Sequence, residues 1–312
     1  MRVRFSFVYL FPKENLMSIA SQCSILFIVV LVGVFCRKRG FFTDEVIRGV
    51  TQLAVNITVP ALTISSMQRP FEHEVLTGVL MTMLFTTLIT LASLALGLFL
   101  FRNRTSDRRA VMASITAFTN CGFMGFPIVL AFNPDWMIYA VAFSSTNGIL
   151  VWSLGTMLFA GKENLSFRRI VLNPNVISAM IGFIIFLFSF TLPTVVYDSL
   201  SLIGGMTTPL TMLLIGTRVC GIRLSALKEW DYHIAALIRL IVMPLLVYTM
   251  MRLIPLSVPV KGILFLLTAM PAGTVISMQA ELFDADAVFA SRAIAWTTLL
   301  ALFTVPVMGL LL

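Results

Sequence analysis

The chain has little charge. Only 12% of its 312 residues are Asp, Glu, Lys or Arg, which is about half the share that is usual in soluble domains. Hydrophobic residues make up 59% and the mean hydropathy is +0.98. A membrane-spanning helix needs about 20 apolar residues, so ten such runs would fill most of the chain. The sequence predicts a polytopic, all-α membrane protein and excludes a sizeable soluble domain.

Residues for metal binding and catalysis are scarce as well. There are two histidines, His73 and His233, and four cysteines without a C-x-x-C pair, which argues against a zinc site and a disulfide framework. The phosphate-binding motif G-x-x-x-x-G-K-[ST] and the zinc motif H-E-x-x-H do not occur, which argues against an ATP motor and an intramembrane metalloenzyme. We expect no enzyme activity, no metal and no cofactor.

The basic residues that give the chain its net charge of +8 lie where the loops of a membrane protein are expected. Apolar runs and polar breaks predict ten spans, near 17–36, 46–67, 77–101, 110–132, 136–160, 174–192, 199–220, 233–253, 260–282 and 287–312. Fifteen lysines and arginines lie in the odd-numbered loops or at the span ends beside them, against six in the N-terminal segment and in or beside the even-numbered loops. This distribution does not fit nucleic-acid binding. By the positive-inside rule it places the odd loops in the cytoplasm and both termini outside, in the cell (inner or plasma) membrane.

The spans divide into two sets of five. We expect an N-terminal extension at 1–16, a first repeat at 17–160, a cytoplasmic linker at 161–173 and a second repeat at 174–312. Because five is odd, homologous halves would lie in the membrane with opposite orientation, the inverted-repeat plan of many secondary transporters. Met17 would also make a natural start of the chain.

Two spans at matching places in the halves are interrupted. The fourth reads T-N-C-G-F-M-G-F-P at 119–127, and the ninth reads M-P-A-G-T at 270–274. Glycine and proline open the backbone hydrogen-bond ladder, which is tolerated in a membrane where protein or a water-filled cavity satisfies the freed groups. The N-terminal ends of the resulting half-helices suit a carboxylate. Simple kinks in packed helices are the alternative.

Polar residues near these breaks are the candidate site. Asn120 offers a neutral amide at the fourth-span break, and Asn56 and Thr208 belong to the small, polar segments that hold a proline in the second and seventh spans. Asn147 and Gln279 are weaker candidates, and Arg239, within the eighth span, is either functional or snorkels to the surface. Glu281, Asp284 and Asp286 are interpreted as solvated at a turn. The predicted substrate-binding residues are Asn120, Thr119, Gly122, Pro127, Pro271, Ala272, Gly273, Thr274, Asn56 and Thr208.

With these motifs the chain resembles the auxin efflux carrier family, which groups plant auxin exporters with bacterial carriers of malate, malonate and related acids. The resemblance runs from residue 17 to 312. Its most specific stretches are N-C-G-F-M-G-F-P-I at 120–128, N-P-N-V-I-S-A-M-I-G at 173–182, P-L-T-M-L-L-I-G at 209–216 and R-L-I-V-M-P at 239–244. Plant members have a proline where this chain has Thr119, and many have a long insertion where it has the short loop 161–173. The bacterial, malate/malonate permease-like type therefore fits better.

The resemblance implies a fold related to sodium/proton antiporters and bile-acid symporters. In that fold ten helices form two inverted five-helix repeats, and broken helices four and nine cross beside a substrate site between a scaffold and a mobile core. It implies that Asn120 and the break at 271–273 face the substrate.

Three functional hypotheses follow. The first is a secondary carrier (permease or efflux carrier) that moves a mono- or dicarboxylate by alternating access. The second is a sodium-coupled symporter for bile-acid-like or keto-acid substrates, and the third is a membrane sensor or subunit that does not transport. The expected partners are the lipid bilayer and a small organic acid. The sequence leaves open the substrate, the direction of transport, the coupling ion (H⁺ or Na⁺) and a homodimer.

Overall fold

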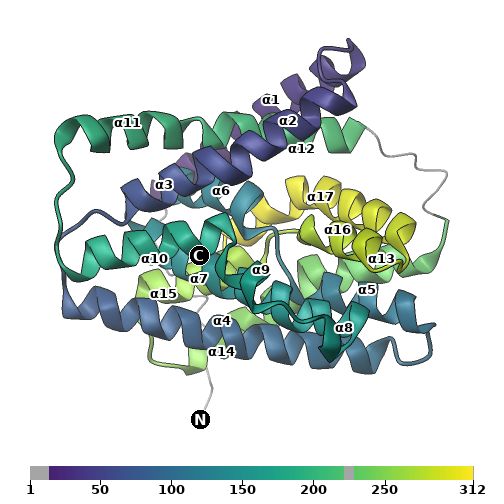
Figure 1. Ribbon diagram of the computed structural model, residues 1–312. Coiled ribbons are helices and arrows are strands. Elements are labelled where there is room, and N and C mark those ends of the chain that lie inside the picture. Colours follow the sequence, from purple (N-terminus) through teal and green to yellow (C-terminus); the bar gives the residue numbers. More distant parts are fainter. Residues whose placement is uncertain (1–13, 221–227, 312) are drawn as a thin grey trace.

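The computed structural model describes residues 14–220 and 228–311, with side chains from Ser24 onward. Within these residues all regular elements are helices (Figure 1). Six continuous helices are long and apolar enough to cross a membrane, at Asp44–Ser66, His73–Leu100, Pro134–Ala160, Thr194–Cys220, Trp230–Leu253 and Ala287–Gly309. The chain is therefore a multi-pass membrane protein. The predicted extension 1–16 lies almost wholly outside the described residues.

The first half contains nine α-helices and the turns between them. They are α1 (Glu14–Lys38), α2 (Asp44–Leu53), η1 (Ala54–Thr58), α3 (Val59–Ser66), α4 (His73–Leu100), α5 (Ser106–Ala117), η2 (Cys121–Gly125), α6 (Phe126–Phe132), η3 (Pro134–Trp136), α7 (Met137–Leu150), η4 (Val151–Gly155), α8 (Thr156–Ala160), η5 (Lys162–Asn164) and α9 (Phe167–Val171).

The second half continues in the same manner. It contains α10 (Pro174–Leu187), α11 (Thr194–Gly205), α12 (Thr207–Cys220), α13 (Trp230–Leu237), η7 (Ile238–Val242), α14 (Met243–Leu253), α15 (Val258–Thr268), α16 (Val275–Leu282) and α17 (Ala287–Gly309). The chain breaks between α16 and α17 where the sequence predicted a turn.

Three of the wide, π-helical turns have a visible cause in the sequence. The turns η1, η2 and η7 each end two residues before a proline, at Pro60, Pro127 and Pro244. Proline has no N–H to donate, and its ring clashes with the carbonyl four residues earlier. A turn with i→i+5 bonds moves that carbonyl away and lets the helix continue.

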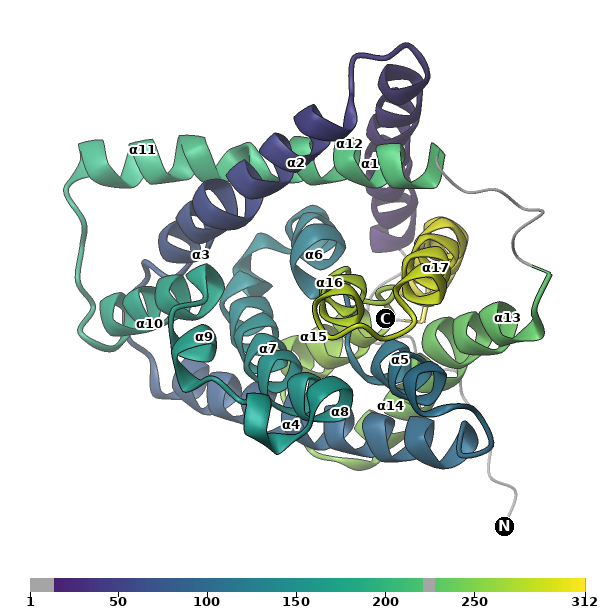
Figure 2. The same ribbon diagram turned by 45° about the vertical axis from the view of Figure 1, so that its right-hand side comes forward.

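The helices form two bundles, and each bundle takes elements from both halves of the sequence. A four-helix bundle contains α1, α2–η1–α3, α10 and α11–α12, and lies at the top and left of Figure 2. Glycines bring its helices together: a Cβ added at Gly33 or Gly216 would overlap the backbone of the facing helix, and one at Gly204 would lie 2.8 Å from the Cα of Leu62.

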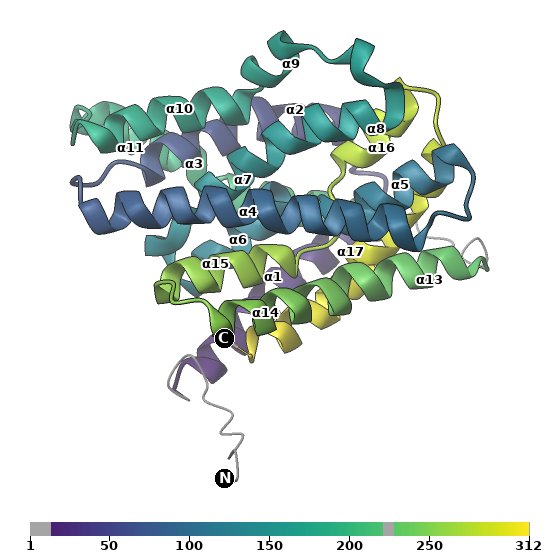
Figure 3. The same ribbon diagram turned by 90° about the horizontal axis from the view of Figure 1, so that it is seen from below.

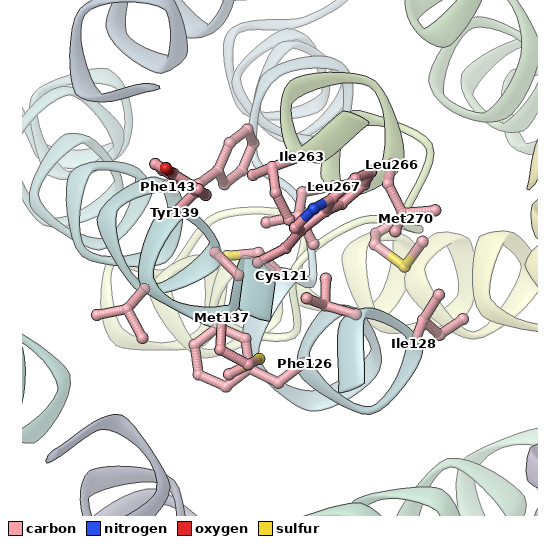
Figure 4. Close-up of a cluster of buried hydrophobic side chains, with 14 of the residues drawn as sticks. Cys121, Phe126, Ile128, Met137, Tyr139, Phe143, Ile263, Leu266, Leu267 and Met270 are labelled. Carbon is pink, nitrogen blue, oxygen red and sulfur yellow. The ribbon is translucent and has the colours of Figure 1, made fainter. Parts of the chain in front are cut away.

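The second group, here called the crossing bundle, contains α4 to α8 and α13 to α17. Helix α15 lies between α4 and α14 (Figure 3). Apolar side chains from the helix 121–132, from α7 and from α15 fill the space around the end of α15 (Figure 4). They include Cys121, Phe126, Ile128, Met137, Tyr139, Phe143, Ile263, Leu266, Leu267 and Met270.

An ion-pair network closes one end of the crossing bundle, in the loops that are rich in arginine. Arg108 pairs with Glu229 at 2.8 Å and with Asp286 at 2.9 Å, and Arg104 pairs with Asp231 at 2.6 Å. Asp286 also accepts a hydrogen bond from the N–H of Phe289 at the start of α17. The interpretation of Asp286 as merely solvated was wrong, because this carboxylate ties the α16–α17 turn to the first turn of α5.

Candidate functional site

The two predicted breaks lie against each other. Between α5 and η2 the chain is extended, and there the N–H of Asn120 donates to the carbonyl of Pro271 at 2.8 Å. Between α15 and α16, the N–H of Gly273 donates to the carbonyl of Phe118 at 3.0 Å. These bonds form a short antiparallel bridge centred on Thr119 and Ala272. Each break therefore satisfies backbone groups that the other leaves open, as burial in a membrane requires.

The place where the two breaks meet, at 118–120 and 271–273, is here called the crossing. Neighbouring side chains stabilise it. The hydroxyl of Thr119 donates to the carbonyl of Leu267 at 2.9 Å. The amide of Asn147, on α7, lies 3.5 Å from the carbonyl of Thr119, and the hydroxyl of Thr297, on α17, accepts from the N–H of Ala272 at 3.4 Å. A Cβ at Gly273 would lie 3.2 Å from the carbonyl oxygen of Thr119, so the absence of a side chain favours this close approach.

Arg239 is the buried cation of the crossing, with only 1% of its surface exposed. Its Nε donates to the carbonyl of Met270 at 3.0 Å, and its two terminal nitrogens donate to Thr116 at 2.9 Å and Thr268 at 2.6 Å. These carbonyls belong to the C-terminal ends of α5 and α15, which carry partial negative charge. The snorkelling alternative is thus wrong, because the guanidinium turns inward and binds both broken helices.

Two helices also begin at the crossing, and among the described residues no acidic side chain balances the partial positive charge of their N-terminal ends. The helix 121–132 begins after Asn120 and α16 begins after Thr274, and neither residue caps its helix with its side chain. Asn120 is 7% exposed, and within the described part of the chain its side-chain amide has no hydrogen bond. A Cβ at Gly122 would meet no atom within 4 Å, so the first turn of η2 borders open space.

The charge at the crossing is positive. Among the described residues, Arg239 and Asp231 are the charged side chains that are buried, and Asp231 is paired with Arg104 in the network at the end of the bundle. Throughout residues 14–220 and 228–311, no three His, Cys, Asp or Glu side chains form a cluster that could hold a metal. A carboxylate supplied from outside would meet partial positive charge and an open amide.

The predicted site residues fall into three groups. Thr119, Asn120, Pro271, Ala272 and Gly273 form the crossing itself, with Gly122 and Thr274 one or two residues away. Pro127 is buried in α6, behind the π-helical turn.

The remaining two candidates lie in the four-helix bundle. Asn56 is exposed there and its amide donates to the carbonyl of Gln52 in the preceding turn, while Thr208 is the second residue of α12. Their contact with a substrate stays a prediction. The sequence did not lead us to predict Thr297. The feature that could have revealed it is the pair of threonines, 297 and 298, within the last apolar run.

These features define the class: a multi-pass membrane protein with paired interrupted helices, a construction that is found in many secondary transporters. The comparison with known families agrees. The chain belongs to the auxin efflux carrier family, because the family model described as "Membrane transport protein" matches residues 18–309.

Two archaeal transporters are similar to the chain over nearly its whole length. An uncharacterized transporter of Methanocaldococcus jannaschii is 23% identical over 300 residues, which cover 92% of this chain and 97% of that protein. An uncharacterized transporter of Methanothermobacter thermautotrophicus is 23% identical over 295 residues, which cover 91% and 95%. The chain is a membrane transporter, and nothing in its family indicates catalysis.

Proposed function

We propose that this transporter is a secondary carrier for a small organic anion with one or two carboxylates. The observation that carries the proposal is the asymmetry of the crossing. Arg239 binds the carbonyls at the negative ends of α5 and α15, whereas the positive ends of the helices after Asn120 and Thr274 have no acidic partner among the described residues. A carboxylate at these ends completes the electrostatics that the protein leaves incomplete.

Asn120 gives this site a neutral donor. A buried cation next to the substrate would hold an anion firmly, because charge-assisted hydrogen bonds are about twice as strong as neutral ones. An amide together with backbone N–H groups binds a carboxylate more weakly and lets it leave on the other side. The residues that contact the substrate in this proposal are Asn120, Gly122 and Thr274.

The mechanism that suits this construction is alternating access. Ten helical segments would cross the membrane as two inverted repeats of five, with the arginine-rich end in the cytoplasm and both termini outside. The four-helix bundle would serve as the scaffold and the crossing bundle as the moving part, so that the crossing carries the anion between the two faces.

The test is substrate-induced current from proteoliposomes on a solid-supported membrane. Malate, malonate, citrate, pyruvate and indole-3-acetate are supplied with and without a sodium gradient, and radiolabel uptake detects electroneutral flux. We expect transport of at least one acid, lost in Asn120→Ala and in Asn120→Asp, whose carboxylate repels the substrate. Unchanged uptake by a folded Asn120→Asp protein would remove Asn120 from the site. A strict sodium requirement would favour a symporter, and binding without flux would favour a sensor.

A further inference from the structure

One of the segments that join the two bundles lies on the surface of the molecule. It is the predicted linker 161–173, which leaves the crossing bundle after α8 and enters the four-helix bundle at α10. Gly161, with a φ of +79°, ends α8 and turns the chain. The turn η5 and the short helix α9 follow, outside the packed helices (Figure 3), and no residue of the linker is buried.

The linker exposes basic and large apolar side chains next to each other. Its exposed basic residues are Lys162, Arg168 and Arg169. Large apolar side chains are exposed at Leu165, Phe167 and Leu172. Phe167 is the most open of these, with 80% of its surface exposed. The linker has one acidic residue, Glu163, and is therefore positively charged. Positive charge together with exposed apolar surface is typical of segments that lie in the interface of a membrane.

The basic residues of the linker lack the partners that other arginines on the surface have. In the ion-pair network at the end of the crossing bundle, Arg104 and Arg108 are neutralised by carboxylates from other elements. Among the described residues, no carboxylate forms a salt bridge with Lys162, Arg168 or Arg169. An anionic group from outside the chain can therefore bind these cations without displacing an ion pair.

The position of the linker brings it to the surface of the bilayer. A membrane span ends at Ala160, directly before the linker, and an apolar helix begins at Pro174, directly after it. The linker closes its own turns: the amide of Asn164 donates to the carbonyl of Ala160 at 2.7 Å, and the hydroxyl of Ser166 accepts from the N–H of Arg169 at 3.4 Å. Local hydrogen bonds thus shape the linker, and its outer side chains remain available to the headgroup layer.

We propose that the linker 161–173 binds the anionic headgroups of membrane lipids. Arg168 and Arg169 pair with the phosphate groups, to which a guanidinium can donate two parallel hydrogen bonds, and Phe167 enters the apolar layer below them. Each basic residue near an anionic membrane surface adds to the attraction. Because the linker connects the two bundles, the bound headgroups hold that connection at the membrane surface. Lipid binding of this kind does not depend on which solute the protein transports.

The test is hydrogen–deuterium exchange of the full chain in nanodiscs. These contain phosphatidylcholine alone, or phosphatidylcholine mixed with phosphatidylglycerol, which is anionic. The proteins are the wild type, Arg168→Gln/Arg169→Gln, Phe167→Ser and Arg39→Gln/Arg102→Gln. The last is the matched control, because it removes the same charge from exposed arginines of two other loops. All substituted positions are exposed, and equal thermal unfolding midpoints in detergent establish that the variants are folded.

We expect phosphatidylglycerol to slow the exchange of the linker amides about tenfold or more in the wild type and in the control. In Arg168→Gln/Arg169→Gln the slowing should fall to about twofold or less, because each cation contributes about fivefold to binding at an anionic surface. Phe167→Ser should fall between the two. Raising the ionic strength to about 1 M should remove most of the wild-type effect, because exposed charges are screened by salt.

Equal exchange of the wild-type linker in the two lipid mixtures would overturn the inference, and the linker would then be a solvated loop or a contact for a soluble protein. An equal loss in the control variant would overturn it as well, because the effect would belong to the overall charge of the chain. Slow exchange in both lipids that only Phe167→Ser accelerates would replace headgroup binding by a purely apolar anchor. Uptake of organic anions is measured separately, so the carrier can fail while lipid binding holds, and the reverse.

Discussion

A guanidinium suits the interior of this crossing because of its shape. Three of its nitrogens reach carbonyls of three different residues, on two helices that end within the membrane. Carbonyl groups at a helix end lack partners within the helix, and in a buried position each would cost free energy if left without a donor. Arg239 supplies these donors from a third element, η7, and so joins the breaks of both halves.

We expect Arg239→Met to destabilise the protein by about 3 kcal/mol or more, since three buried acceptors lose their donor at about 1–3 kcal/mol each. Arg239→Lys should fall between Met and the wild type, because an ammonium group cannot reproduce the planar fork. Thermal unfolding in detergent measures the change. Arg252→Met, at an exposed position on α14, is the control. Equal midpoints for Arg239→Met and Arg252→Met would contradict the role assigned to Arg239.

Some residues of the crossing could be predicted from the local sequence, and others could not. Asn120, Gly122 and Gly273 could be selected because polar residues and glycines stand out within an apolar run. The role of Arg239 could not, because its partners are main-chain carbonyls, which every residue has and which no side-chain pattern marks. Whether such an arginine turns inward or outward depends on the fold around it.

At the scale of elements, the short helix α16 has a buried polar anchor in Gln279. Gln279 is fully buried, and its amide donates to the carbonyl of Val151 at 2.9 Å, in the π-helical turn η4. Such a turn frees carbonyls from the regular ladder, so an external donor is valuable there. Gly155 makes room for this side chain, since a Cβ at that position would lie 2.7 Å from the Gln279 side-chain oxygen.

Gln279→Met should therefore destabilise the protein by about 1–3 kcal/mol, the cost of leaving a buried carbonyl without its donor. Hydrogen–deuterium exchange should show the loss concentrated in α16 and η4. Met278→Leu is the matched control, because Met278 is the adjacent residue on α16 and is 48% exposed. Its effect should remain within about 0.5 kcal/mol. Uniform exchange in Gln279→Met and the wild type would show that α16 is held by its apolar contacts alone.

Elements could be predicted from sequence where a local cause exists. Apolar runs located the helices, and glycine and proline located the breaks after Ala117 and after Thr268. The three π-helical turns before Pro60, Pro127 and Pro244 follow from the chemistry of proline. The bridge between Thr119 and Ala272 is different, because its residues are about 150 positions apart and their hydrogen bonds use only backbone atoms. The turn η4 has no proline and left no local signal.

At the scale of the molecule, the two halves of the sequence do not form two separate bodies. Each bundle takes helices from both halves, and glycine contacts hold α1 against α12 while the paired breaks hold α5, α15 and α16 together. Direct backbone bonds and close glycine contacts lie within the bundles. Across the boundary α3 and α10 pack on α7, and α1 and α12 pack on η2, α6 and α17, where apolar side chains line a pocket. In the proposed mechanism one bundle slides on the other along these contacts.

Fixing the bundles together should therefore stop transport. Phe27 on α1 and Phe303 on α17 meet across the boundary, with ring centroids 6.4 Å apart, and His233 and Trp296 meet within the crossing bundle at 5.6 Å. A short bis-maleimide should abolish uptake by the cysteine pair Phe27→Cys/Phe303→Cys. The control pair His233→Cys/Trp296→Cys should keep its untreated rate of uptake. So should the wild type, which controls for the four native cysteines. Full uptake by the cross-linked boundary pair would show that the carrier works by local motions of the broken helices, with the two bundles at rest.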